Sequence, residues 1–558
     1  MLLISILLLS LALQVASETL HLDFNITWVA VNPDGLRERR TIGVNDQWPP
    51  PRIEGNVGDI VVLNVRNLLE GQSTSLHLHG ISMKGTPHMD GASGVSQCPI
   101  LPGNTFQYIF ELTNLGTYWY HAHDGAQSAD GLRGLLIVRD PNPPYKHQWD
   151  GEIILSLSDW YHEQISDLGH SRDENETTLA IPAPDSILLN DARTFRVNVS
   201  PGTTYLVRVV NTGAFAGQYL QIADHEMVIV EVDGVYTEPQ TTQGIYLAPG
   251  QRYSFLMTAK NETSANYPII TTLDLAEEHR ADMTATGWIM YDSSLPTDDL
   301  DAQDPLRPSD LLDDMSLVPL DNTPLLDPSS RRITLDITMS ESDDGGKRWA
   351  FNNTIYSPPT VPTLYTALAT KQKATDPAIY GTSINPFVLH ADEIVELIIN
   401  NPSDTQHVFH LHGHEFGVMY RSASGAGEFD ATHEDKERSP QTPMRRDTVA
   451  VNPGSSVVLR FKADNPGIWL LQSQIAWPSH SGLAVTFVES PLELQRSLSL
   501  SSIPIPFGDA CAEGSVEIIM AEPLRIEGVR TPADSVLYVS LSTDRSGTGA
   551  NVAFEVMA

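Results

Sequence analysis

Short runs of β-branched and other apolar residues recur along the whole chain, each bounded by glycine, proline or asparagine. Clear examples lie at residues 60–65, 204–210, 393–399 and 456–461. A Pro-Gly pair precedes several strand-like runs, at residues 102–103, 201–202, 249–250 and 453–454. Regular helical periodicity is scarce. Because short strands separated by tight turns are typical of sandwiches and barrels, the sequence predicts an all-β protein built from repeated β-domains.

The chain is too long for a single β-domain. It has 558 residues, against about 100–200 for a typical domain, so three or four domains are expected. Residues 293–330 are rich in Asp and Pro and carry little periodic apolar content. This composition predicts a solvated linker between the second and third domains.

The N-terminus and the sequons indicate export. Residues 1–17 form an apolar run that ends in small residues, as in a signal peptide. The run is shorter than the ~20 residues that a bilayer requires, and no second run of spanning length follows. We therefore expect a secreted protein without a membrane span. Glycosylation is expected at five sequons: Asn25, Asn175, Asn198, Asn261 and Asn352.

Charge and cysteine content narrow the possible partners and the compartment. The formal charge is −36, from 34 basic and 70 acidic residues. Nucleic acid is excluded as a partner because phosphate binding needs a basic surface. The two cysteines, Cys98 and Cys511, most simply form one disulfide in an oxidising compartment. A free pair or an intermolecular bond remains the alternative.

Histidines gather in three places with the spacing His-x-His. The pairs are His77 and His79, His121 and His123, and His410 and His412, the last pair preceded by His407. On a strand, residues i and i+2 face the same side, so each pair presents two imidazoles together. This arrangement predicts a metal site. Imidazole suits copper, zinc and iron alike, so the spacing alone does not name the metal.

Four segments resemble the copper motifs of the multicopper oxidases, a family that includes laccases, ascorbate oxidase and fungal iron-uptake ferroxidases. They are HLHG at 77–80, GTYWYHAH at 116–123, HVFHLHGHEF at 407–416 and WLLQSQIAWPSHSGL at 469–483. Within the family the chain is most similar to fungal iron-transport oxidases. The resemblance implies three cupredoxin-like Greek-key β-barrel domains, at 18–142, 143–292 and 331–500, before a tail at 501–558. It also implies copper as cofactor and a disulfide between Cys98 and Cys511.

The resemblance assigns a role to each histidine of the motifs. His77 and His410 resemble the type 2 copper ligands, and His407 resembles a type 1 ligand. Four others resemble ligands of the type 3 copper pair: His79, His121, His123 and His412. Asp90 matches the family's catalytic acid beside the copper cluster.

The last motif, at 469–483, keeps the flanking residues of the family's pattern but not its copper ligands. Where the family places His, Cys, His and His, this chain has Gln472, Ser473, Gln474 and Pro478. A blue type 1 centre depends on a thiolate and two imidazoles, and a serine has no accessible anion near neutral pH. His480 is interpreted as a loop histidine because its position does not match the family's pattern, with a substitute copper ligand as the alternative.

These residues support three hypotheses of function. The first is a secreted family member that is impaired as a four-copper oxidase and acts as an accessory or binding protein. The second is an active laccase-like oxidase of small phenolic or polyketide substrates. The third is a mononuclear copper protein using His77 and His410, with or without His407. The partner protein is unknown from the sequence.

Overall fold

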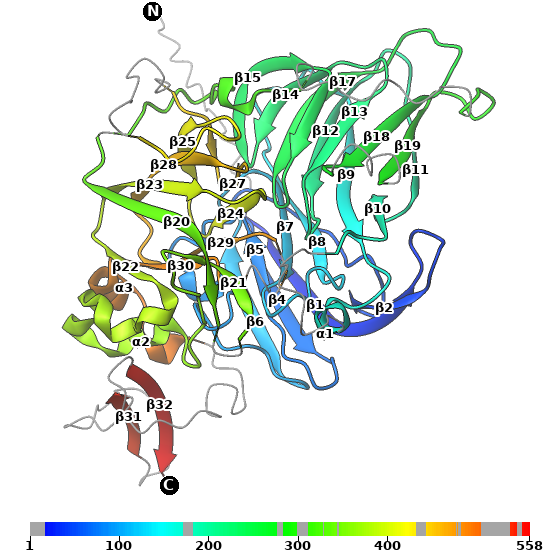
Figure 1. Ribbon diagram of the computed structural model, residues 1–558. Coiled ribbons are helices and arrows are strands. Elements are labelled where there is room, and N and C mark those ends of the chain that lie inside the picture. Colours follow the sequence, from blue (N-terminus) through cyan, green and yellow to red (C-terminus); the bar gives the residue numbers. More distant parts are fainter. Residues whose placement is uncertain are drawn as a thin grey trace, which may run out of the picture.

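The computed structural model is dominated by strands (Figure 1). It describes residues 17–170, 182–275, 283–297, 311–326, 328–342, 345–430, 442–475, 477, 481–503, 536–543 and 550–557. The predicted all-β class is confirmed. Among the described residues, no helix is long and apolar enough to cross a membrane.

The first barrel packs two four-stranded sheets, in the orders β2-β1-β4-β6 and β3-β8-β7-β5. Burial alternates residue by residue along β6, as expected for a strand with one face on the core and one in solvent. Strand β7 is buried along its whole length because a neighbouring domain covers its second face. The elements are β1 (Thr19–Val31), β2 (Arg39–Val44), β3 (Ile53–Asn56), β4 (Ile60–Asn67), β5 (Leu76–His79), the short 3-10 helix η1 (Pro87–Met89), β6 (Thr105–Glu111), β7 (Gly116–Ala122) and β8 (Arg133–Arg139).

The second barrel has a six-stranded sheet, β10-β9-β12-β17-β14-β15, and a five-stranded sheet, β11-β19-β18-β13-β16. The turn at residues 248–251 contacts the first barrel at His79 and the third barrel at Thr448. The elements are β9 (Gly151–Trp160), α1 (Ile165–His170), β10 (Ser186–Leu189), β11 (Thr194–Asn198), β12 (Thr204–Asn211), β13 (Gln218–Ile222), β14 (Met227–Val232), β15 (Val235–Thr242), β16 (Gly244–Leu247), β17 (Arg252–Thr258), β18 (Tyr267–Leu273) and β19 (Thr284–Met290).

The third barrel repeats this plan with the sheets β21-β20-β23-β28-β25-β26 and β22-β30-β29-β24-β27. Two short helices, α2 and α3, lie at one end of it (Figure 1). The elements are β20 (Arg331–Glu341), β21 (Lys347–Phe351), α2 (Thr363–Ala369), β22 (Pro386–Leu389), β23 (Glu393–Asn401), β24 (His407–Leu411), β25 (Phe416–Arg421), β26 (Arg445–Arg446), β27 (Thr448–Val451), β28 (Ser455–Ala463), β29 (Gly467–Ser473), β30 (Ala484–Glu489) and α3 (Pro491–Ser497).

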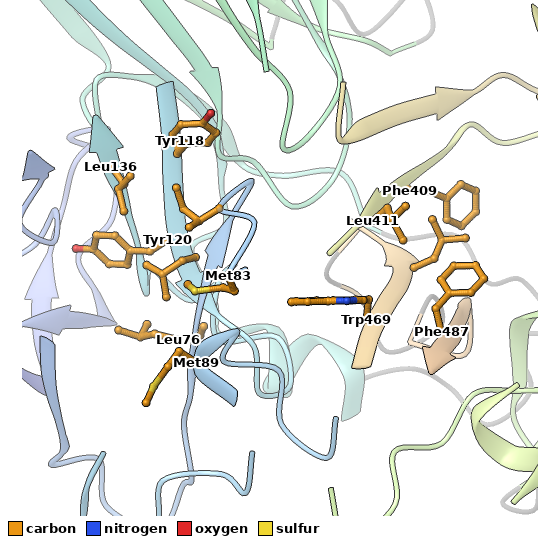
Figure 2. Close-up of a cluster of buried hydrophobic side chains, with 14 of the residues drawn as sticks. Leu76, Met83, Met89, Tyr118, Tyr120, Leu136, Phe409, Leu411, Trp469 and Phe487 are labelled. Atoms are coloured by element: carbon orange, nitrogen blue, oxygen red, sulfur yellow. The ribbon is translucent and has the colours of Figure 1, made fainter. Parts of the chain in front are cut away.

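Apolar side chains of the first and third barrels form one continuous buried cluster. Figure 2 shows Leu76, Tyr118 and Tyr120 on the first barrel and Phe409, Leu411 and Trp469 on the third. These residues lie on β5, β7 and β24, which carry histidines of the motifs, and on β29, which carries Gln472 and Ser473. The core therefore fixes the strands of the candidate site against one another.

The acidic segment between the second and third barrels differs from its prediction as a solvated linker. In its described part, Leu317 is buried and Thr237 pairs with Pro319 of the segment. Asp314 accepts a bond of 2.6 Å from the buried Arg446. The segment is held because its aspartates find buried cationic partners, which composition alone does not reveal.

Several predicted positions lie outside the described residues. They are residues 1–16 of the signal peptide, Asn175, Pro478, His480 and Cys511. Cys98 is buried at the end of the third barrel, against residues of α2 and α3. In the tail, β31 (Val536–Thr543) and β32 (Ala550–Met557) form an antiparallel hairpin. The domain boundaries and the disulfide pairing stay predictions.

Candidate metal centre

Six of the predicted histidines meet where the first and third barrels touch. Strands β5 and β7 pair with His77 opposite His121, and β24 faces them from the third barrel. The ring centroids of His77 and His412 are 3.9 Å apart, and those of His79 and His410 are 3.6 Å apart. The group, called here the histidine cluster, consists of His77, His79, His121, His123, His410 and His412.

The ring nitrogens inside the histidine cluster have either another imidazole or no described group as hydrogen-bond partner, unlike most buried polar atoms. The Nε2 atoms of His77 and His410 face each other at 3.4 Å. The distance from an imidazole nitrogen to a bound ion such as zinc is about 2.0 Å, so two nitrogens 3.4 Å apart can bind the same ion. Four further ring nitrogens are buried without a hydrogen-bond partner among the described residues: His79 Nδ1, His121 Nε2, His123 Nε2 and His412 Nε2.

The opposite ring nitrogens of these histidines are held by hydrogen bonds. Such bonds fix the tautomer and the ring orientation of a metal-binding imidazole. The contacts are His77 Nδ1 to Asp90 O at 2.8 Å, His410 Nδ1 to Asp447 O at 3.0 Å, His412 Nδ1 to Asp90 Oδ2 at 2.8 Å, His121 Nδ1 to Ala122 O at 3.0 Å and His79 Nε2 to Thr448 Oγ1 at 2.9 Å. Asp90 therefore orients one histidine from each barrel.

Electrostatics favour the neutral form of His121, His123 and His412, which keeps the lone pairs of these rings available. Burial, followed by the charge of His77, lowers the pKa of His123 to about 4. The same two causes hold the pKa values of His121 and His412 well below the ordinary range. Burial alone raises the pKa of Asp90, but the adjacent His412 and His77 outweigh it and keep the carboxyl ionised. A neutral imidazole is the form that binds a metal.

The region of the predicted type 1 centre has a different chemistry. His407 is buried on β24, with its Nε2 atom 3.2 Å from Ser403 Oγ. The hydroxyl of Ser473 accepts a hydrogen bond from the backbone N–H of Ile475 at 3.3 Å. The neutral hydroxyl of Ser473 therefore occupies this position, on strand β29, which pairs with β24. The described donors at this position do not form the thiolate set of a blue copper centre.

Gln472 and Gln474 lie beside the histidine cluster. Gln472 is opposite His410 in the register of β24 and β29, and its side chain acts to raise the pKa of His123 against the larger effect of burial. Gln474 is buried, and its Oε1 atom has no hydrogen-bond partner in the described part of the chain. A cavity of about 370 Å³ runs along both glutamines, Ser473, His121 and His123.

One contact to the histidine cluster was missed by sequence reasoning. The Asp447 carboxylate lies 3.4 Å from His79 Nε2 and 3.5 Å from His410 Nδ1. Asp447 directly precedes β27, where Thr448 pairs with His410. An acid next to a strand that borders a His-x-His strand is a signal that could have found it.

Comparison with known proteins identifies this architecture. Three sequence families, each described as "Multicopper oxidase", match residues 25–143, 151–294 and 356–493. The iron transport multicopper oxidase fetC of Epichloe festucae is 46% identical over 531 residues, which cover 93% of this chain and 84% of that protein. An iron transport multicopper oxidase FET3 of Gibberella zeae is 44% identical over the same shares of the two chains.

Two solved structures of multicopper oxidases have a similar fold. The crystal structure of Fet3p, a multicopper oxidase that functions in iron import, has a TM-score of 0.82 at 37% identity, covering 89% of this chain and 94% of that one. A laccase from Botrytis aclada has a TM-score of 0.76 at 28% identity, covering 89% and 92%. Fold and site together define a protein of three cupredoxin-like domains with a histidine cluster between the first and the third. The chain belongs to the multicopper oxidase family.

Copper, the predicted cofactor, is the metal of this family. The histidine cluster fits it, because six imidazoles converge and four of their ring nitrogens are buried without other partners among the described residues. Groups that could each hold one ion are His77 with His410 and His412, and His77 with His79 and His121.

Proposed function

We propose that this chain is an exported copper-binding protein of the multicopper oxidase family that acts by binding and does not reduce dioxygen to water. The observation that carries the proposal is the hydroxyl of Ser473, which accepts a backbone hydrogen bond where a blue centre needs a thiolate. Without that thiolate the chain lacks both the type 1 ligand and the covalent path from it to the histidine cluster.

Copper binding itself is supported by the intact part of the site. His77 and His410 offer the facing pair of nitrogens at 3.4 Å, and His412 completes a group of three. This geometry favours the mononuclear copper protein as the specific form of the binding function. Copper bound there would supply a redox-active Lewis acid, and the protein orients the ring nitrogens that would hold it. A small phenolic substrate belongs to the competing oxidase hypothesis.

The test is metal analysis and spectroscopy of protein produced with ample copper. We expect bound copper below the family's full set of four, an EPR signal of the type 2 kind and no intense blue band. Phenol added to this sample should stay unoxidised. An intense blue colour with dioxygen uptake would overturn the proposal and favour the active laccase-like oxidase.

Reversion variants sharpen this test. The combined change Gln472→His, Ser473→Cys, Gln474→His and Pro478→His should recover the blue band if the barrels still position the site. The matched control is Ser473→Cys alone, which should recover little because the ligands of one centre act as a unit. Equal recovery in both variants contradicts the assignment of the four positions.

Export is the second part of the proposal. It is supported by the apolar residues 1–17 and by the placement of the sequons. Asn198, Asn261 and Asn352 are exposed, Asn25 is half-buried and Asn175 lies outside the described residues. Peptide mapping of protein collected from the culture medium tests it. A mature chain that begins near residue 18 and carries glycans is expected, and retention of residues 1–17 would contradict it.

A further inference from the structure

The turn at residues 248–251 of the second barrel reaches the histidine cluster, although no described residue of that barrel belongs to the cluster. Gly250 has a φ of +84°, and a Cβ placed on it would lie 3.0 Å from His79 Cε1 and 3.2 Å from Gln474 Cγ. Gln251 Nε2 donates to the carbonyl of Thr448 at 3.0 Å. This turn, one of the recurrent Pro-Gly turns, therefore covers one side of the site.

Arg252 follows the turn and binds the Asp447 carboxylate through two hydrogen bonds. Its Nη1 and Nη2 atoms each donate to one carboxylate oxygen at 2.6 Å. Both side chains are buried, with 0% and 3% of their surface exposed. Arg252 Nε also donates to the carbonyl of Thr117 on β7, at 3.0 Å. A two-bond pair of this kind fixes the plane of the carboxylate as well as its position.

The fixed carboxylate in turn contacts two histidines of the cluster. Asp447 Oδ1 lies 3.4 Å from His79 Nε2 and 3.5 Å from His410 Nδ1, and it accepts a bond of 2.7 Å from Thr448 Oγ1. These contacts use the outer nitrogens of both rings. His79 Nδ1 and His410 Nε2 are thereby directed toward the interior of the cluster.

The glycine after His79 shows how closely these groups pack. A Cβ on Gly80, whose φ is +89°, would lie 2.6 Å from Arg252 Nη2 and 2.8 Å from Asp447 Oδ2. Any side chain at residue 80 would therefore push the ion pair away from the strand that carries His79.

His79, His410 and Asp447 could by themselves be read as a cation site, since one ligand atom of each lies within 4.8 Å of the others. The Arg252 guanidinium already binds both carboxylate oxygens. A second cation on the same carboxylate would be repelled strongly in this buried position. The carboxylate therefore orients the imidazoles and does not bind a metal ion.

We propose that Arg252 is a positioning residue for copper: the second barrel, through Arg252 and Asp447, sets the ring orientation of His79 and His410. The inference rests on the proposed copper site. Loss of such an outer contact typically weakens metal binding about 10- to 100-fold.

The variant Arg252→Gln tests the proposal, and Arg446→Gln is its matched control. Arg446 is equally buried, and it binds Asp233 at 3.0 Å and Asp314 at 2.6 Å without a described contact to the Asp447 carboxylate. Both variants should lose stability. Only Arg252→Gln should bind Cu(II) about 10- to 100-fold more weakly and change the EPR spectrum of the bound ion. Arg252→Lys keeps the charge but cannot make the two parallel hydrogen bonds to Asp447, so its affinity for Cu(II) should lie between those of Arg252→Gln and the unmodified protein.

Equal affinities of Arg252→Gln and the unmodified protein, or equal losses in the two glutamine variants, would overturn the proposal. If Arg252→Gln does not fold, the double variant Arg252→Met with Asp447→Asn removes both charges together and leaves neither buried alone. It should show the same weakening of Cu(II) binding.

The copper site and the positioning role can fail separately. If the unmodified protein binds no copper, the proposed function fails, and crystal structures of the metal-free variants decide the positioning role. His79 and His410 rings rotated in Arg252→Gln, but not in Arg446→Gln, support it. Unchanged rings in both variants refute it.

Discussion

Single imidazoles of the histidine cluster make the metal-free protein sensitive to acid. The pKa of His123 is lowered from 6.5 to about 4, so between these values the unfolded chain holds a proton that the folded chain lacks. Stability is therefore complete above about pH 6.5 and falls as the pH drops toward about 4. His121 and His412 act in the same direction. Urea-unfolding midpoints of copper-free protein measured across this range check the prediction.

The control for the pH dependence is His123→Gln, which removes one of the titrating rings. Its unfolding midpoint should change less between about pH 6.5 and 4 than that of the unmodified protein. A midpoint that stays constant across this range in the unmodified protein would contradict the buried, neutral state of the rings.

At the scale of elements, the contact between η1 and β5 depends on Gly91. Its φ is +87°, and a Cβ there would lie 1.7 Å from the carbonyl oxygen of Leu76, next to His77. We expect Gly91→Ala to cost about 3 kcal/mol or more and to abolish copper binding, because the backbone of β5 must move. Denaturant unfolding and metal analysis measure both effects.

Gly58 supplies the comparison for that glycine. Its φ is +91°, and the structure describes no atom within 4 Å of a Cβ placed there. Gly58→Ala should therefore cost only the about 1–2 kcal/mol of a left-handed conformation and leave copper binding intact. Similar losses in the two variants would show that the close approach of η1 to β5 is unimportant.

Strand periodicity explains why the histidines of the cluster could be predicted from the sequence, whereas the residues that orient their rings could not. Alternation along β5 places His77 and His79 on one face. His410 lies on β24 and His412 follows the end of that strand, with the two ring centroids 5.0 Å apart, so local spacing suffices here as well. Arg252 and Asp447 are 195 residues apart and meet only because three barrels pack together. The packing of residues 311–320 was missed for the same reason. The replacement of the family's ligands by Gln472, Ser473 and Gln474 can be recognised from the sequence alone, because the flanking residues of the motif are kept.

For the whole molecule, the predicted Cys98–Cys511 bond would tie the tail to the buried pocket that holds Cys98. It closes a long loop, so the chain-entropy contribution should approach about 4–5 kcal/mol. We expect Cys511→Ser to lose up to this amount in the free energy of unfolding. Reductant should lower the stability of the unmodified protein and leave the variant unchanged. Alkylation of both cysteines in unreduced, unfolded protein would exclude the bond.

The facing nitrogens of His77 and His410 have a mechanical consequence. They belong to residues 333 positions apart in the chain, on two different barrels. An ion shared by them is a reversible cross-link over that whole span, closed by mass action and opened by a chelator or by acid. The concentration of free copper would then set the stability of the contact between the first and third barrels, and removal of the ion would weaken that contact.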